Sequence, residues 1–249
     1  MNDRDKLPVS EASRRWRLSP ISIILIVSVL VGAYVSAGYS RTLSRLLRER
    51  REFAEVFGEM AIEDPSQVGI VAVAPTAVEL PPWVDPENVS IFRVHIPANY
   101  GLTLAINEQL VAADSPLSTN GGSSSSYPGE PAAREIQIIV STNREDGHLK
   151  GSLLTNSGSS PFSFTNTLAK SPEDLVLDIV TSPGQPARTF AIDEAICLWR
   201  LRNKEPSNKM LNQNKLYSGC AIYLHERSRS EAFNRWSNGS SSSMKSSAP

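Results

Sequence analysis

Cysteine is scarce in this chain of 249 residues, and its scarcity excludes several classes of protein. The two cysteines, Cys197 and Cys220, are too few for a disulfide-rich scaffold or a four-cysteine zinc site. Histidine is almost as rare: His95, His148 and His225 lie far apart, and none has the spacing of a metal-binding pair. The sequence therefore predicts no metal site and no cofactor.

Sequence motifs for catalysis are missing as well. The chain has no G-x-S-x-G nucleophile turn, no phosphate-binding G-x-x-x-x-G-K-[ST] loop and no H-E-x-x-H zinc motif. The carboxylates of Glu173, Asp174 and Asp178 are expected to be solvated, and no aromatic platform for a sugar accompanies them. We therefore expect no catalytic residue and favour a role other than that of an enzyme.

Neither sign of charge dominates the chain. Its 25 lysines and arginines are matched by 26 aspartates and glutamates, for a formal net charge of -1. Nucleic-acid binding normally needs a basic surface, so no nucleic-acid partner is expected. Ten of the basic residues nevertheless lie within the first 51 positions, five on each side of an apolar segment.

That apolar segment, residues 19–40, is the clearest functional signal in the sequence. It contains no charged residue, and Ile21 to Val31 is almost entirely β-branched or leucine. A helix of this length, rising about 1.5 Å per residue, would span a hydrocarbon layer roughly 30 Å thick. The segment is therefore predicted to be a transmembrane helix that acts as a signal anchor, with the lipid bilayer as a partner.

A cleavable signal peptide is the alternative for the same segment. Arg14, Arg15 and Arg17 form a basic start, and Val35-Ser36-Ala37 before Gly38 resembles a cleavage site. Cleavage would release a secreted protein. The apolar run is longer than the usual core of a signal peptide, and five arginines follow it closely, which favours the uncleaved anchor. The balanced flanking charges do not fix the orientation. We expect the N-terminus inside and the C-terminal domain extracytoplasmic, because long C-terminal domains tend to be translocated.

The next segment, Arg41–Ile62, is predicted to be helical because it lacks proline and is rich in helix formers. Its apolar residues recur at spacings of three and four, as in a short coiled coil that would mediate self-association. An amphipathic helix lying on the lipid headgroups is the equally weighted alternative. The candidate residues for self-association are Leu43, Leu46, Phe53, Phe57 and Met60, and Arg50 interrupts their row.

From residue 89 onward the pattern is that of β-strands. Val89–Ile96 alternates apolar and polar residues, and about eight such runs are separated by clusters of Gly, Pro, Asn and Ser. This repetition predicts a β-sandwich-like domain. A short strand over Val68–Val73 could precede it within the proline-rich connector. The serine-rich stretch 115–133 is predicted to be a disordered insertion.

The two cysteines are candidates for a disulfide. If Ile196–Arg202 and Leu216–Leu224 pair as antiparallel strands, Cys197 and Cys220 lie opposite each other in one possible register. A bond between them would stabilise the fold by roughly 3 kcal/mol. The alternative is a pair of buried free thiols that act as small apolar side chains.

The predicted architecture is mainly β, with one N-terminal transmembrane helix and a juxtamembrane helix. The favoured function is a single-pass, membrane-anchored interaction or scaffolding module, with a protein partner in the envelope or a second copy of itself. An envelope hydrolase with an unrecognised site and an oligomeric subunit of a membrane assembly are the alternatives. The expected parts are a basic cytoplasmic tail (1–18), a transmembrane helix (19–40), a juxtamembrane helix (41–63), a connector (64–88), the β domain (89–225) and a serine-rich flexible tail (226–249).

Overall fold

The structure, a computed structural model, describes residues 20–57, 60, 62–145, 148–156, 158–163, 171–240 and 246–247. The chain divides into two compact units, residues 1–50 and 51–249. The predicted cytoplasmic tail, residues 1–18, lies outside the described residues.

Helix α1 (Pro20–Phe57) joins the two predicted N-terminal helices into one element of 38 residues. Proline opens the helix, a position where its missing N–H is not needed. The hydroxyls of Thr42 and Ser44 donate to carbonyls one turn earlier, at 3.0 and 2.9 Å, so these polar residues fit within the helix. The described helix runs to Phe57, and Ile62, the predicted end, is not helical.

The predicted membrane span is not shown by the structure. Among the described residues, no helix combines the length and the apolar character that crossing a membrane requires. The side chains of residues 22–24, 26 and 27, within the apolar run, lie outside the described part.

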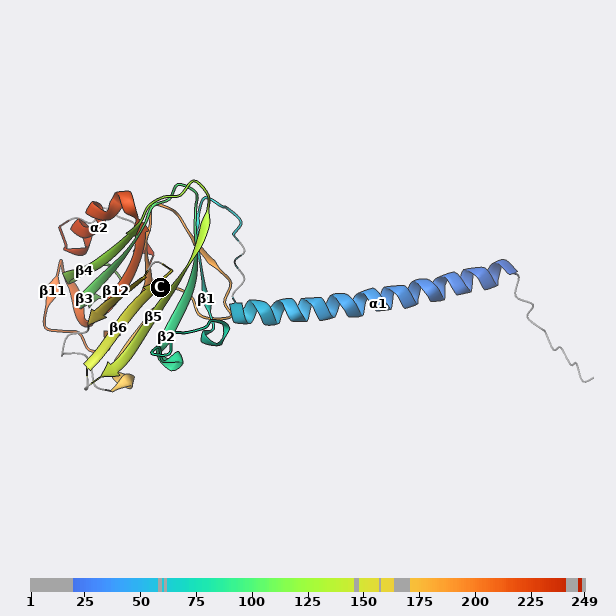
Figure 1. Cartoon of the computed structure of the whole chain (residues 1–249), viewed down its shortest axis with the longest axis horizontal. Helices are drawn as coiled ribbons and strands as arrows, with labels where there is room; N and C mark the ends of the chain where they lie inside the picture. Colours follow the sequence, from blue (N-terminus) through green and yellow to red (C-terminus); the bar gives the residue numbers. More distant parts are fainter. Residues whose placement is uncertain are drawn as a thin grey trace, which may run out of the picture. The chain divides into compact units, whose positions relative to one another are not determined.

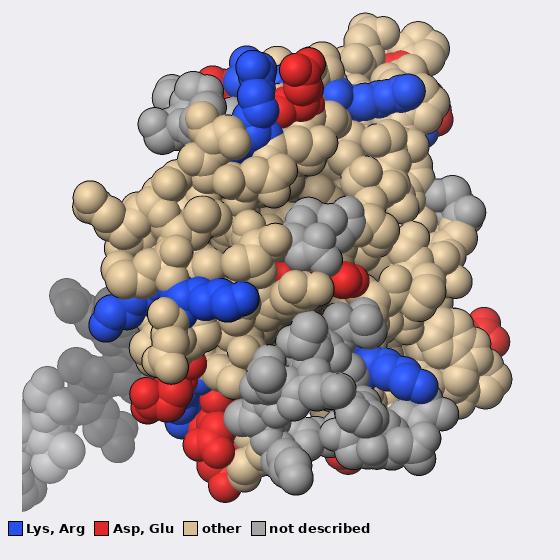
Figure 2. All heavy atoms as spheres, turned by 90° about the vertical axis from the view of Figure 1, so that its left-hand side faces the viewer, with Lys and Arg blue, Asp and Glu red and all other residues tan. Residues whose placement is uncertain are grey.

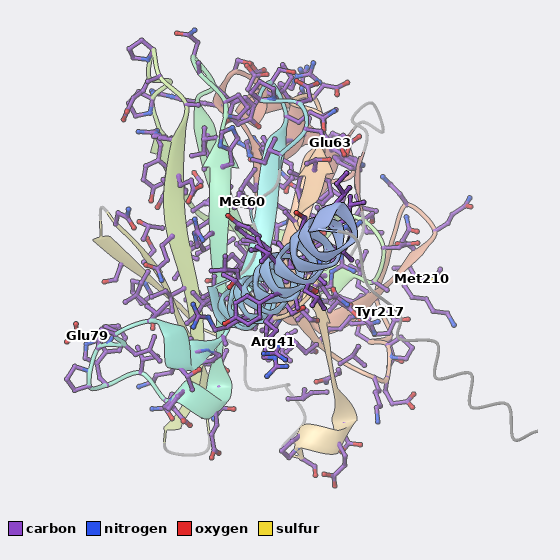
Figure 3. All side chains as sticks on the ribbon, turned by 90° about the vertical axis from the view of Figure 1, so that its right-hand side faces the viewer. Arg41, Met60, Glu63, Glu79, Met210 and Tyr217 are labelled. Carbon is purple, nitrogen blue, oxygen red and sulfur yellow. The ribbon has the colours of Figure 1, made fainter. Side chains whose placement is uncertain are left out.

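Met60 does not belong to the helix, contrary to the prediction. Its sulfur lies 3.3 Å, and the Ile62 Cδ1 atom 2.6 Å, from the place where a Cβ on Gly69 would stand. Met60 and Ile62 therefore pack against Gly69 of strand β1 (Val68–Val73), where the absence of a side chain leaves room for them. Met60 is labelled in Figure 3.

Two sheets, antiparallel except where the two-residue strand β13 joins the second, form the β domain, as the sandwich-like prediction requires (Figure 1). The first sheet has the order β7-β6-β5-β2-β1-β9. Its strands are β1 (Val68–Val73), β2 (Val89–Ile96), β5 (Arg134–Glu145), β6 (His148–Thr155), β7 (Gly158–Ser163) and β9 (Arg188–Phe190). The alternation of Val89–Ile96 gives a strand with the predicted bounds, and β1 confirms the expected short strand.

The second sheet is built around β10, β12, β3 and β4, in that order. Strand β8 pairs with one end of β10, the two-residue strand β13 runs parallel to the other end, and β11 forms a hairpin with β12. The bounds are β3 (Leu102–Ala112), β4 (Ser118–Tyr127), β8 (Leu175–Ile179), β10 (Ala195–Asn203), β11 (Met210–Leu211), β12 (Asn214–Glu226) and β13 (Ser246–Ser247).

A single large apolar core lies between the two sheets. Phe92 and Ile138 from the first sheet, and Leu104 and Ile222 from the second, are fully buried or nearly so and belong to one cluster. Their burial follows from strand alternation, which directs every second side chain toward the opposite sheet. The shared core makes the domain sandwich-like, and it supplies the main favourable term in folding.

The prediction of a disordered insertion at 115–133 is wrong for much of its length. Residues Ser118–Tyr127 form strand β4, which pairs antiparallel with β3. The strand is stabilised by main-chain pairing rather than by large side chains, so its serine-rich composition gave no sign of it. At its end, the Tyr127 hydroxyl lies 2.6 Å from the Thr155 Oγ1 of β6 and so bonds the two sheets to each other.

The predicted flexible tail also contains structure. Helix α2 (Ser230–Ser237) follows β12 and lies against β12 and β4 on the outer face of the second sheet (Figure 1). Phe233 is 1% exposed and Trp236 is 9% exposed, because both pack on Ala105, Ala221 and neighbouring residues of that face. These two aromatic residues within an otherwise polar segment are the signal for the helix.

The surface of the β domain carries charges of both signs. On the face drawn in Figure 2, blue and red side chains occur in small groups separated by uncharged surface. Ion pairs such as Arg93–Glu135, with 2.5 Å between Nη2 and Oε2, join neighbouring strands β2 and β5. Such exposed pairs stabilise a fold by about 0–1 kcal/mol each.

Candidate binding pocket between the sheets

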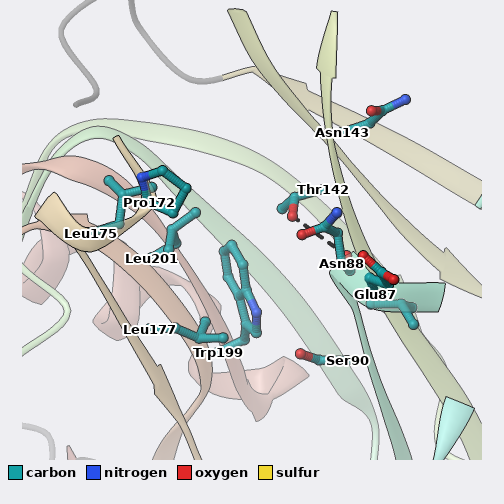
Figure 4. Close-up of a pocket in the computed structure, with 11 residues that line it drawn as sticks. Glu87, Asn88, Ser90, Thr142, Asn143, Pro172, Leu175, Leu177, Trp199 and Leu201 are labelled. Atoms are coloured by element: carbon teal, nitrogen blue, oxygen red, sulfur yellow. Dashed lines mark hydrogen bonds between the residues drawn. The ribbon is translucent and has the colours of Figure 1, made fainter. Parts of the chain in front are cut away.

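A pocket of about 450 Å³ opens between the two sheets (Figure 4). Strands β8 and β10 supply one wall, and strands β2 and β5 with the turn before β2 supply the other. Its volume falls in the range of small-ligand sites. The described residues that line it are Glu87, Asn88, Val89, Ser90, Thr142, Asn143, Pro172, Leu175, Leu177, Trp199 and Leu201.

The apolar wall centres on Trp199. A β-bulge in β10 interrupts the register between Cys197 and Trp199, so that both Leu198 and Trp199 belong to the core between the sheets. The Trp199 ring meets Phe162 of β7 edge-on, with 6.1 Å between the ring centroids. It is only 3% exposed, whereas Leu177 at the mouth is 51% exposed.

The opposite wall is polar and is held by a short turn. The turn Pro86–Asn88 is capped by Asp85, whose Oδ1 accepts from the Glu87 N–H at 3.0 Å and whose Oδ2 accepts from the Asn88 Nδ2 at 2.6 Å. The Thr142 hydroxyl donates to the Asn88 carbonyl at 3.4 Å, shown as a dashed line in Figure 4. These bonds fix the polar wall opposite the tryptophan.

A second, smaller pocket extends the first along β8. It measures about 210 Å³ and shares Val89, Ser90 and Leu177 with the larger pocket. Its further lining includes Ile179 of β8 and Ile91 of β2. The two pockets together form a mostly apolar groove, which follows β8 along the flank of the sandwich.

The chemistry of the groove suits binding. Glu87 is the one titratable side chain among its described lining residues. In the part of the chain that the structure describes, no group of three or more His, Cys, Asp and Glu residues is arranged to hold a metal ion. A ligand in this site would be held by its fit to the groove, by apolar contacts and by a few hydrogen bonds.

Neither of the two histidines whose side chains are described lies in the groove. His225 is buried on the outer face of the second sheet, where its ring stacks on Phe233 at 4.4 Å between centroids. Its Nδ1 lies 2.8 Å from the Glu226 carbonyl oxygen, and burial lowers its pKa. His95 lies on β2, and the His148 side chain is outside the described residues.

The predicted disulfide between Cys197 and Cys220 is not formed; both cysteines are free and buried. In the observed register Cys197 faces Tyr223, and Cys220 faces Leu201. Cys197 packs beneath helix α2, while Cys220 belongs to the core between the sheets. The bulge and a different register place the two thiols on opposite faces, so the alternative of two free thiols is the one observed.

The residues predicted to mediate self-association are only partly described. Leu43 and Leu46 lie on α1 and are 59% and 52% exposed. The side chains of Phe53 and Phe57 lie outside the described residues. Met60, as noted, packs over β1 instead.

Sequence reasoning did not identify the groove. Trp199 lies in an apolar run of the sequence, and a tryptophan in a core and a tryptophan in a pocket wall give the same alternation. The Asp85-Pro86 pair, which starts a turn capped by Asp85, is the signal that the sequence carried. Comparisons of the chain with protein-family models, curated proteins and solved structures produced no match.

Proposed function

We propose that this protein is a membrane-anchored, non-catalytic binding module whose β domain holds a partner in the groove between its sheets. The observation that carries the proposal is the pocket itself, with the Trp199 wall facing a hydrogen-bonding wall formed by Asn88 and Thr142. Pockets with a mainly apolar lining and a few fixed polar groups are typical ligand sites.

Binding is favoured over hydrolysis because of the residues in the groove. General acid–base catalysis needs a titratable group, and usually a second one, within hydrogen-bond reach of the substrate. Glu87 has no histidine or second carboxylate beside it among the described lining residues. A hydrolase would require catalytic groups from elsewhere in the chain.

Membrane anchoring is the second part of the proposal and rests on the sequence. The uncharged run 19–40 lies between two groups of five basic residues, and residues from Pro20 onward are helical. We propose that this run holds the protein in a bilayer, with the β domain on the extracytoplasmic side. The exposed Leu43 and Leu46 on the same helix favour self-association as a further property.

Cysteine labelling of whole cells tests the anchoring. The native thiols are buried, so Ser10→Cys and Asn208→Cys can each be introduced into the natural sequence. A membrane-impermeant maleimide should label position 208 and not position 10 in intact cells, with the full-length mass retained. Labelling of position 10 alone, or a loss of about 37 residues after cleavage at the alternative site, would contradict the anchored, extracytoplasmic topology.

Photo-crosslinking in native membranes tests the binding module. A photoreactive amino acid is placed at Leu177, in the groove, or at Met210, a residue of the β11 hairpin that is at least as exposed. We expect a discrete covalent adduct from position 177 and none of the same mass from position 210. Equal adducts from both positions, or none from position 177, would contradict a partner in the groove.

A further inference from the structure

We propose that the partner is an extended peptide that adds to the open edge of strand β8 and inserts an apolar side chain beside Trp199. This inference rests on the proposed binding function and specifies the class of partner. Addition of a strand at a sheet edge gains affinity from main-chain hydrogen bonds and specificity from pockets for alternate side chains.

The hydrogen bonds that flank β8 show which of its backbone groups are open. The Lys204 N–H donates to the Asp174 carbonyl at 2.8 Å, and the Val180 N–H donates to the Leu198 carbonyl at 3.1 Å. In an antiparallel ladder, alternate residues bond to the same neighbour. The even-numbered residues of β8 therefore bond to β10, and the backbone groups of Leu177 and Ile179 point toward the other edge.

That other edge has no strand partner within the described part of the chain, where β8 pairs with β10 alone. Such an edge presents unpaired N–H and C=O groups and acts as a template for another strand. Because β8 spans five residues, it offers room for a short peptide rather than for a whole sheet.

The groove lies beside this edge. Leu177 lines both pockets, and Ile179 lines the smaller one. A peptide strand on the edge of β8 would direct every second side chain toward the core side, where the 450 Å³ pocket and Trp199 lie. The exposed Leu177 would lose its contact with water, which contributes to affinity.

The charges near the groove favour a basic peptide. Glu87 lines the pocket, and Glu173 and Asp174 adjoin its lining residue Pro172. All three are on exposed residues, and Lys204 already lies near Glu173, so Glu87 and Asp174 are the carboxylates most open to lysine or arginine side chains at the rim of the groove. We therefore expect apolar and basic residues to alternate in the peptide. Pairing with exposed carboxylates also raises the rate of association at low salt.

The probe for this inference is a seven-residue peptide in which lysine alternates with valine and leucine, applied to the full-length protein in detergent micelles. Fluorescence anisotropy of the labelled peptide should show saturable binding. Replacing its lysines with glutamate should weaken binding at least tenfold. Replacing Glu87 with glutamine should weaken binding about threefold at low salt and have no effect at high salt.

Two N-methylated versions of the peptide test strand addition directly. One is methylated on the lysine nitrogens and the other on the valine and leucine nitrogens. In a paired strand only one of these sets faces β8. One version should therefore lose at least tenfold in affinity while the other stays within threefold of the parent. Equal affinity of the two versions would overturn strand addition and leave binding in the groove intact.

Leu177→Pro and Leu177→Ala provide the matched protein variants. Both remove the leucine side chain, but only proline removes the N–H that faces the open edge, and a proline is tolerated at such a position. The proline variant should bind the peptide about fivefold more weakly than the alanine variant. Equal binding by the two would overturn strand addition.

Three remaining outcomes separate this inference from the function on which it rests. If the lysine peptide does not bind but position 177 still gives a crosslink in membranes, the peptide inference is overturned and the proposed binding function stands. The absence of both would overturn the two together. Concentration-dependent dimers that Leu177→Pro abolishes would show that a second copy occupies the edge, which would also overturn a peptide partner.

Discussion

The guanidinium of Arg200 donates a hydrogen bond from Nη2 to the Sγ of Cys197, at 3.2 Å. Both side chains are buried on the outer face of the second sheet. The same Nη2 also lies 3.1 Å from the Tyr223 hydroxyl. The two residues are three apart in sequence, a spacing that normally places strand residues on opposite faces. The bulge at Leu198 brings them to the same face.

Arg200 is predicted to be replaceable by an apolar residue of similar length. It is 1% exposed and lies 3.8 Å from Asp178, while its Nε and Nη1 atoms have no hydrogen-bond partner. Burial of an incompletely bonded charge is costly. Arg200→Met should therefore raise the free energy of unfolding, or lower it by less than about 1 kcal/mol. Arg200→Ala should lower it by about 3 kcal/mol, because it leaves a cavity.

Urea denaturation of the two arginine variants measures this difference. Asp178 keeps a second cation, because the Arg202 Nε lies 3.4 Å from its Oδ2. Equal destabilisation by methionine and alanine would show that the charge of Arg200, and not its volume, holds the site together.

Both thiols are predicted to be unreactive in the folded protein. Burial raises the pKa of Cys197 and raises that of Cys220 well above its ordinary value, so the reactive thiolate is rare at neutral pH. Ellman's reagent at pH 7.5 should modify neither cysteine in the native protein and both in guanidinium chloride. A peptide joining the two cysteines in a non-reducing digest would contradict the observed register.

His225 is predicted to make the stability of the β domain depend on pH. Burial lowers its pKa, so the unfolded chain takes up a proton at a higher pH than the folded domain does. The contribution of neutral His225 to stability is fully present above the pKa of the unfolded chain, about 6.5. It is lost as the pH falls from there toward the pKa of the folded domain. Urea midpoints measured from pH 7.5 to pH 5 should therefore decrease.

The matched variant for that experiment is His225→Phe, which keeps a ring against Phe233 and removes the titration. Its midpoints should vary less over the same pH range than those of the natural sequence. An unchanged slope would assign the pH dependence to other groups.

Tyr127 is predicted to stabilise the strand that composition alone suggested was disordered. Loss of its 2.6 Å bond to Thr155 in Tyr127→Phe should lower the free energy of unfolding by about 1 kcal/mol. In a double-mutant cycle with Thr155→Val, the two effects should be less than additive, because each variant removes the same bond. Additive effects, or rapid amide exchange throughout Ser118–Tyr127, would contradict the pairing of β4.

The sequence predicted those parts of the β domain where side chains alternate in burial. Val89–Ile96 has the predicted bounds, and the other predicted apolar runs became strands with ends shifted by a few residues. The strand Ser118–Tyr127 could not be predicted in this way, because serine and glycine give no apolar period even when their backbones are paired. Gly158–Ser163, the neighbouring edge strand, was missed for the same reason.

By itself, then, the sequence determined a mainly β domain preceded by a long helix that contains an apolar run. Tertiary structure decided the bulge at Leu198, the separation of Cys197 from Cys220, the docking of Phe233 and Trp236, and the groove beside Leu177. The reason is physical: local periodicity records whether a side chain faces a core. Register, bulges and open edges depend on pairing between segments that lie far apart in the chain.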